Sequence, residues 1–143
     1  MDKDKIEEIK NIIGPLRVYE NELLSKHTYF KIGGPAKLFF EAKNTEDFIL
    51  ALQTAQKLKI PLVVLGSGAN VLVSDKGFEG LVIKNRTDGV KLVGIKGSIG
   101  KKGIGIKNAL VWAASGTLMN RIARFTIDQN LEGLEFLLSV HLP

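Results

Sequence analysis

The sequence has no cysteine, which excludes a disulfide framework, a thiolate metal site and a cysteine nucleophile, and which fits a reducing compartment. Its two histidines, His27 and His141, lie far apart with no cluster of carboxylates beside them, so we expect no metal site. No apolar run approaches the roughly 18 residues that a membrane-spanning helix needs, and the charged residues 1–8 do not resemble an export signal. These absences predict a cytoplasmic protein without a membrane partner.

The composition is that of a globular protein. Of the 143 residues, 45% are apolar, 24% are charged and 7% are aromatic, which excludes wholesale disorder and low-complexity sequence. This length suits one domain or two small lobes with a real apolar core.

The basic residues are concentrated in one stretch. The net charge is +5, and five of the 20 lysines and arginines lie between Lys91 and Lys107. Such a stretch could follow the phosphates of a nucleic acid, but it contains no aromatic side chain on which a base could stack. We therefore expect a solvated loop between strands and no nucleic-acid partner.

The chain is predicted to begin with a short amphipathic helix. Ile6, Ile9 and Ile13 recur at spacings of three and four residues with charged residues between them, and Gly14-Pro15 then ends the pattern. We expect residues 4–13 to form a docked N-terminal extension.

A parallel strand-helix-strand unit is predicted next, which indicates an α/β fold. Residues 36–42 are expected to form one strand, and residues 62–65 another that is buried on both faces of its sheet. The helix between them is predicted to begin at a cap formed by Asn44 and to end at Pro61. Its expected apolar face consists of Phe48, Leu52, Ala55 and Leu58.

The chain becomes rich in glycine after residue 65. Ten of the 15 glycines lie between Gly66 and Gly105, which predicts tight turns and a β-rich lobe. The short β-type runs between these glycines are residues 71–73, 81–83 and 104–106.

A second helix is predicted over residues 118–129, with Thr117 or Ser115 as its cap. Its expected apolar face consists of Leu118, Ile122 and Phe125. Six of the last ten residues, 134–143, are apolar. We expect this segment either to dock as a strand or to continue in a longer protein, in which case its apolar side chains predict association of the chain.

The loop after residue 65 is a candidate phosphate site. Small residues from Gly66 to Ala69 allow positive φ angles, so that several N–H groups can converge on an anion. It is not a Rossmann loop, because a β-type run follows it in place of a helix and Val71 stands where the third glycine belongs. It is not a Walker loop either, since the nearest match, residues 94–102, has the wrong spacing and a lysine where the hydroxyl belongs. The alternative is an ordinary turn between strands.

Three segments in this order resemble UDP-N-acetylenolpyruvoylglucosamine reductase, also called UDP-N-acetylmuramate dehydrogenase. The resemblance covers residues 20–136. The segments are residues 27–36 (HTYFKIGGPA), 64–75 (VLGSGANVLVSD) with 77–83 (GFEGLVI), and 131–136 (LEGLEF).

The resemblance implies an FAD-binding domain of the p-cresol methylhydroxylase and vanillyl-alcohol oxidase type, in which two α/β lobes clamp FAD. It implies a helical extension over residues 1–18, a first lobe over residues 19–88 and a truncated second lobe over residues 89–143. The loop would lie against the FAD pyrophosphate, and the implied cofactor-binding residues are Leu65, Gly66, Ser67, Gly68, Ala69, Asn70 and Val71. Trp112, Tyr29 and Phe30 are expected in the core, with a place beside the flavin as the alternative.

The implied activity is that of an oxidoreductase of peptidoglycan precursor synthesis, and hence of cell-wall biogenesis, cell shape and cell division. Its members pass hydride from NADPH through FAD to a UDP-sugar substrate, UDP-N-acetylglucosamine enolpyruvate. The family's catalytic serine, arginine and glutamate have no counterpart in this sequence, so no catalytic residue is assigned and the 143-residue chain alone is expected to be inactive. The alternative is a stand-alone flavin- or nucleotide-binding module without catalysis.

Two departures from the family pattern accompany this resemblance. The family usually has serine where this chain has Ala69, which removes a hydroxyl but leaves the backbone N–H groups in place. The family's second glycine-rich pyrophosphate loop, which follows the segment matched by residues 131–136, is absent here.

Overall fold

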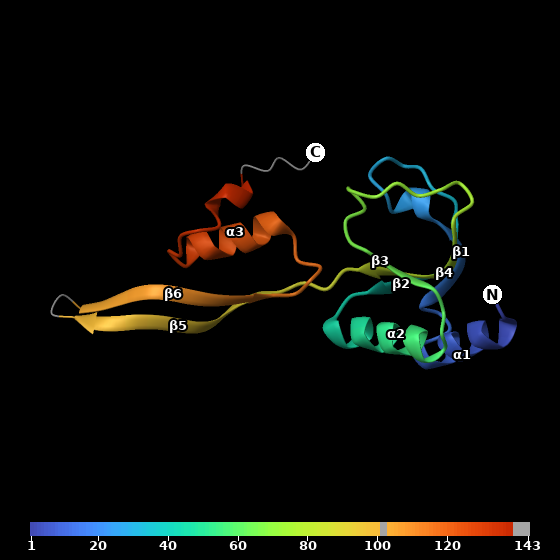
Figure 1. The fold of residues 1–143 in the computed structure, drawn as a ribbon, viewed down its shortest axis with the longest axis horizontal. Coiled ribbons are helices and arrows are strands. Elements are labelled where there is room, and N and C mark those ends of the chain that lie inside the picture. Colours follow the sequence, from blue (N-terminus) through green and yellow to red (C-terminus); the bar gives the residue numbers. More distant parts are fainter. Residues whose placement is uncertain (101–102, 139–143) are drawn as a thin grey trace. The chain divides into compact units, whose positions relative to one another are not determined.

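The structure is a computed structural model that describes residues 1–100 and 103–138 (Figure 1). The chain divides into two compact units, residues 1–87 and residues 88–143. Within the described residues, no helix combines the length and the apolar character needed to cross a membrane.

The first unit is built on a four-stranded sheet in the order β1-β2-β4-β3. Its strands are β1 (Val18–Leu23), β2 (Pro35–Ala42), β3 (Leu62–Leu65) and β4 (Phe78–Asn85). β1 runs antiparallel to β2, whereas β4 is parallel to both β2 and β3. The chain passes from β2 through helix α2 (Thr45–Lys57) to β3, which confirms the predicted parallel unit, although β4 lies between its two strands.

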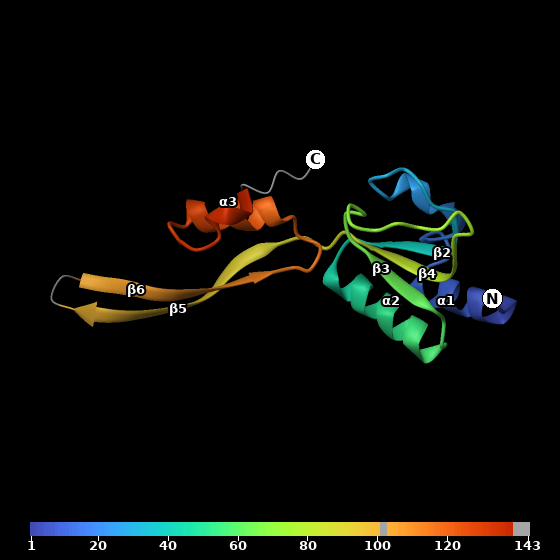
Figure 2. The same ribbon diagram turned by 45° about the horizontal axis from the view of Figure 1, so that its top comes forward.

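Both helices of this unit cover the same face of the sheet (Figure 2). The sequence pattern is confirmed in helix α1 (Lys3–Ile13), where Ile6, Ile9 and Ile13 are buried in the core. α2 begins as predicted, with the Asn44 side chain accepting a hydrogen bond from the Asp47 N–H at 2.7 Å. Alternating strand residues complete this core, namely Leu38 and Phe40 of β2 and Leu81 and Ile83 of β4.

The end of α2 and the burial of β3 differ from the prediction. α2 ends at Lys57, because the chain turns through a left-handed residue, Lys59, before it reaches Pro61. β3 is the outer strand of the sheet, so Val63 and Val64 remain 43% and 44% exposed. The expectation of a strand buried on both faces was wrong because a short apolar run does not reveal whether its strand is central or at an edge.

Residues 71–73 were also expected to be a strand, and they are not. The segment leaves the sheet after β3 and crosses the face opposite α1 and α2, where Val73 packs against the cluster that contains Leu24 and Phe39. The main chain is held at the next residue, where the Ser74 carbonyl accepts a hydrogen bond from the Gly34 N–H at 2.9 Å. The two other predicted β-type runs lie in β4 and in strand β6 (Gly103–Ala113).

The second unit contains a hairpin of β5 (Val90–Gly100) and β6, followed by helix α3 (Met119–Asp128) and a 3-10 turn, η2 (Glu135–Leu138). The basic stretch between residues 91 and 107 therefore belongs mainly to paired strands, and its expected loop character was wrong. The pairing register shifts between Leu92 and Gly94 and again between Lys96 and Gly97, which accommodates the glycines within the hairpin.

The second helix is confirmed, but its predicted cap is not. α3 begins without a side-chain cap, because the Thr117 hydroxyl is engaged with Gly89, donating to its carbonyl at 3.1 Å. Ala123 and Thr126 are the buried residues of α3, while the expected apolar residue Leu118 is exposed. Residues 135–138 form a turn and not a strand, and residues 139–143 lie outside the described residues. Association through the C-terminal segment stays a prediction.

The packing of α1 predicts its contribution to stability. We expect Ile9→Ala, at a fully buried position, to lower the free energy of unfolding by about 2–5 kcal/mol, because it removes apolar contacts and leaves a cavity. Ile12→Ala on the same helix, at a position 39% exposed, is expected to change it by about 0.5 kcal/mol or less. Urea denaturation of the two variants tests this, and equal losses would contradict the docking of α1.

Candidate functional site

The candidate loop lies where the parallel strands β2, β4 and β3 end. Their carboxyl ends share one edge of the sheet, which is where ligands bind in open α/β folds. β3 ends at Leu65, which pairs with Lys84 near the end of β4. Residues 66–70 therefore begin directly beside Lys84.

The loop is shaped by its contact with residues 27–29. The Tyr29 N–H donates to the Gly68 carbonyl at 3.0 Å. Gly68 has φ +83°, and a Cβ placed there would lie 2.2 Å from the His27 carbonyl oxygen. Glycine is required at this position by the packing of the protein itself.

Gly66 has a different environment. Its φ is not in the left-handed region, and a Cβ built there would meet no atom within 4 Å. The expected positive φ is thus found at Gly68 alone among residues 66–70. Among the described residues, none packs so closely that position 66 must be glycine, and the backbone there is open to approach.

A buried lysine lies under the loop. Lys84 is 4% exposed, and its Nζ donates to the His27 carbonyl at 3.0 Å and to the Ser67 carbonyl at 3.5 Å. Burial lowers the pKa of Lys84, the charges of Arg86 and Lys31 act in the same direction, and Glu41 opposes them. The sequence analysis missed Lys84; the available signal was a lysine that directly continues the apolar run 81–83.

The ring of His27 is fixed from two sides. It stacks on Phe39 with the ring centroids 4.2 Å apart, and its Nε2 lies 3.1 Å from Glu22 Oε1. Burial disfavours the charged carboxylate of Glu22, but hydrogen bonds from His27 and Lys26 outweigh this effect and lower its pKa. These contacts hold the residue whose carbonyl accepts from Lys84.

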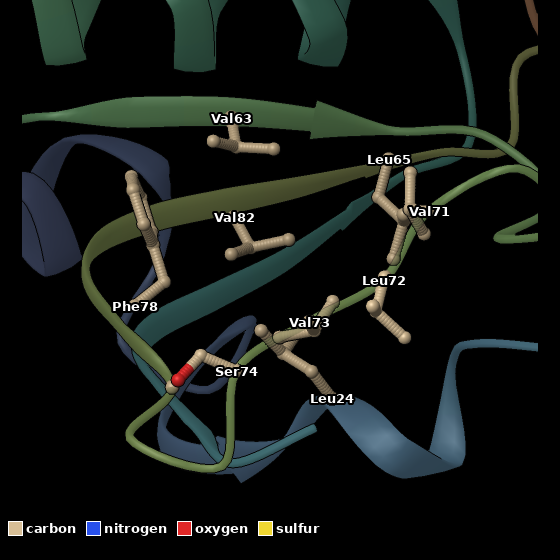
Figure 3. Close-up of a pocket in the computed structure, with 10 residues that line it drawn as sticks. Leu24, Val63, Leu65, Val71, Leu72, Val73, Ser74, Phe78 and Val82 are labelled. Atoms are coloured by element: carbon tan, nitrogen blue, oxygen red, sulfur yellow. The ribbon is translucent and has the colours of Figure 1, made fainter. Parts of the chain in front are cut away.

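An apolar pocket adjoins the loop on the face of the sheet opposite α1 and α2 (Figure 3). Its volume is about 280 Å³, slightly below the roughly 300–1,000 Å³ of typical small-molecule sites, so it suits one ring system better than a whole dinucleotide. Leu65 and Val71, at the two ends of the loop, both line it. The remaining lining residues are Leu24, Val63, Leu72, Val73, Ser74, Gly77, Phe78 and Val82.

Three aromatic residues expected in the core are exposed. Tyr29 and Phe30 are 50% and 60% exposed and touch each other edge to face, with centroids 5.9 Å apart. They belong to the connection between η1 (Leu24–Lys26) and β2, outside the sheet. In the second unit Trp112 is 42% exposed, with Lys91 Nζ 5.0 Å from its ring centroid. Among the residues that the structure describes, which leave out His141, no three His, Asp or Glu side chains are grouped to hold a metal ion.

Comparison with known proteins identifies the class. Residues 36–138 match the family model described as FAD binding domain, and the chain belongs to this family. This match confirms the α/β FAD-binding fold that the sequence predicted.

Within that class, the chain is similar to UDP-N-acetylenolpyruvoylglucosamine reductases, which confirms the resemblance. It is 35% identical to the Lachnoclostridium phytofermentans enzyme over 92% of this chain and 40% of the relative. It is 34% identical to the Carboxydothermus hydrogenoformans enzyme over 98% of this chain and 42% of the relative. The crystal structure of the Thermus caldophilus enzyme matches with a TM-score of 0.53 and 26% identity, over 87% of this chain and 38% of that one. The chain thus spans about 40% of the length of the curated relatives it matches.

The two glycines of the loop are predicted to respond differently to substitution. Gly68→Ala should lower the free energy of unfolding by at least about 1–2 kcal/mol, the cost of a left-handed conformation, with a further loss from the clash with His27. Gly66→Ala should leave stability unchanged or raise it by up to about 1 kcal/mol, because alanine restricts the unfolded chain. Urea denaturation distinguishes them, and equal destabilisation would contradict the described loop.

The pair of Glu22 and His27 predicts a pH dependence. Because the pKa of Glu22 is lowered in the folded state, its carboxylate stabilises the fold above the ordinary glutamate pKa of about 4.3. This stabilisation is lost as the pH falls through the lowered pKa. Wild type should therefore be more stable than Glu22→Gln at neutral pH, and the difference should shrink in acid. A difference that is the same at all pH values would contradict this role of Glu22.

Proposed function

We propose that this chain is the FAD-binding portion of a UDP-N-acetylenolpyruvoylglucosamine reductase and that residues 65–71 contact the FAD pyrophosphate. The observation that carries the proposal is Gly66, which lies beside the buried cation Lys84 and at which a Cβ would meet no atom of the described residues within 4 Å. A backbone that must be approached closely by a ligand is a recognised reason for glycine.

The residues around the loop suit a dinucleotide with a diphosphate. Lys84 lies against the loop and feels the positive charges of Arg86 and Lys31, with Glu41 as the opposing charge, which favours an anionic ligand. The apolar pocket begins at Leu65 and Val71 and offers a place for a ring beside the phosphates. When bound, FAD would supply hydride acceptance and donation, while this chain would supply binding and orientation.

The proposal extends to the arrangement of the chain. Residues 1–18 are an N-terminal helical extension, residues 19–88 are the first lobe around the flavin, and residues 89–143 belong to the second lobe. The complete enzyme would act in the cytoplasm, reducing UDP-N-acetylglucosamine enolpyruvate with NADPH for peptidoglycan synthesis. The similarity to reductases over 92% of the chain favours this function over a stand-alone flavin-binding module.

Titration with FAD tests the proposal. Wild type is expected to quench the fluorescence of added FAD. Gly66→Ala is expected to weaken binding by about tenfold or more, equivalent to about 1.4 kcal/mol, while remaining at least as stable as wild type. Gly94→Ala is the matched control, because Gly94 also has room for a Cβ, with Leu110 Cβ 3.8 Å away. If Gly66→Ala binds FAD as tightly as wild type does, the proposal is wrong and the loop is an ordinary turn.

The same preparation tests the assignment of catalysis. We expect no substrate-dependent NADPH oxidation by the 143-residue chain, because flavin and substrate must be held together and no residue of this chain matches the family's catalytic groups. Substrate-dependent NADPH oxidation by the purified chain would contradict that assignment.

A further inference from the structure

At the position of Lys84, an apolar residue would cost the folded state less free energy. It follows Leu81, Val82 and Ile83, which are all buried, and it is itself 4% exposed. Burying an ammonium group costs free energy unless its donors are satisfied, and apolar replacements of buried charges often leave stability unchanged or higher. A lysine at this position therefore points to a role that stability alone does not explain.

The hydrogen bonds of Lys84 join two segments far apart in the sequence. One acceptor is the His27 carbonyl at 3.0 Å, and the other is the Ser67 carbonyl at 3.5 Å, inside the candidate loop. The same segments meet again where the Tyr29 N–H donates to Gly68. Lys84 thus holds the loop through hydrogen bonds to main-chain carbonyls, and its ammonium charge lies close to the loop.

Other charged groups act on Lys84. Arg86 and Lys31 add positive charge, and Glu41 partly compensates it, with Arg86 Nε 3.9 Å from Glu41 Oε1 at the protein surface. Within the part of the chain that the structure describes, the Lys84 ammonium group donates to two neutral carbonyls and to no carboxylate. A cation bound only by neutral dipoles keeps its attraction for an external anion.

We propose that Lys84 is a positioning residue of the phosphate loop, holding residues 66–70 in their receptive conformation and favouring phosphate-bearing over phosphate-free flavins. This inference rests on the proposed function, since it assumes that the loop binds a flavin nucleotide. It assigns to Lys84 a contribution to ligand selection that acts through the loop and through its charge.

The test compares Lys84→Met, which keeps an unbranched apolar stem of four heavy atoms but removes the ammonium group, with Lys84→Arg, which retains a charge. Lys57→Met is the control, because it removes one positive charge from an exposed position at the end of α2, on the other face of the sheet. Binding of FAD and of riboflavin, which has no phosphate, is measured by flavin fluorescence. Amide hydrogen exchange at Tyr29, whose N–H donates to the Gly68 carbonyl, reports on the loop without any ligand.

Lys84→Met is expected to weaken FAD binding by about tenfold or more, as is typical for losing hydrogen bonds and charge from an ionised group, and to speed amide exchange at Tyr29. Riboflavin binding should change little, Lys84→Arg should recover most of the FAD affinity, and Lys57→Met should match wild type. Equal weakening of FAD and riboflavin would overturn the proposal, because it would mean a purely structural role.

The remaining outcomes are also decisive. FAD binding by Lys84→Met equal to that of wild type overturns the role of Lys84 and leaves the proposed function intact. If wild type binds no FAD, the proposed function fails and the claim of ligand selection fails with it. The positioning of the loop is then judged from amide exchange, and unchanged exchange in Lys84→Met would overturn it too.

Discussion

The close approach of two main-chain segments, residues 27–29 and residues 66–68, is the constraint on which the candidate site depends. It leaves no room for a side chain at Gly68, and it is closed by the hydrogen bond from the Tyr29 N–H to the Gly68 carbonyl. Lys84 donates to both segments from the strand beneath them. The loop is therefore fixed by the protein's own contacts before any ligand is present, which reduces the ordering cost of binding.

The sheet lets one unit hold a core and a site on opposite faces. Phe39 and Phe40 are neighbours on β2 and point to opposite sides, as strand geometry requires. Phe40 packs in the helix-covered core, where Arg17 lies 5.1 Å from its ring centroid, whereas Phe39 supports His27. The helices stabilise the sheet, and the face that they leave uncovered carries the pocket and the contacts beneath the loop.

What could be predicted from the sequence was local. The isoleucine spacing of α1 and the Asn44 cap of α2 are set by residues a few positions apart, and both were predicted correctly. The edge position of β3, the departure of residues 71–73 from the sheet and the engagement of Thr117 with Gly89 depend on partners distant in sequence. Exposure of Tyr29, Phe30 and Trp112 could not be predicted for the same reason, because aromatic character alone does not say which elements cover a side chain.

The candidate loop shows most clearly what could not be predicted from the sequence. Its glycines were predicted together, as small residues that allow a phosphate to approach, yet they serve different requirements. Gly68 is needed by the fold, since its Cβ would meet the His27 carbonyl, while Gly66 faces open space. A change at Gly68 therefore perturbs the loop whether or not a ligand binds, and only a change at Gly66 separates recognition from folding. The same reasoning applies to Lys84, whose cost to the fold makes its presence informative about binding.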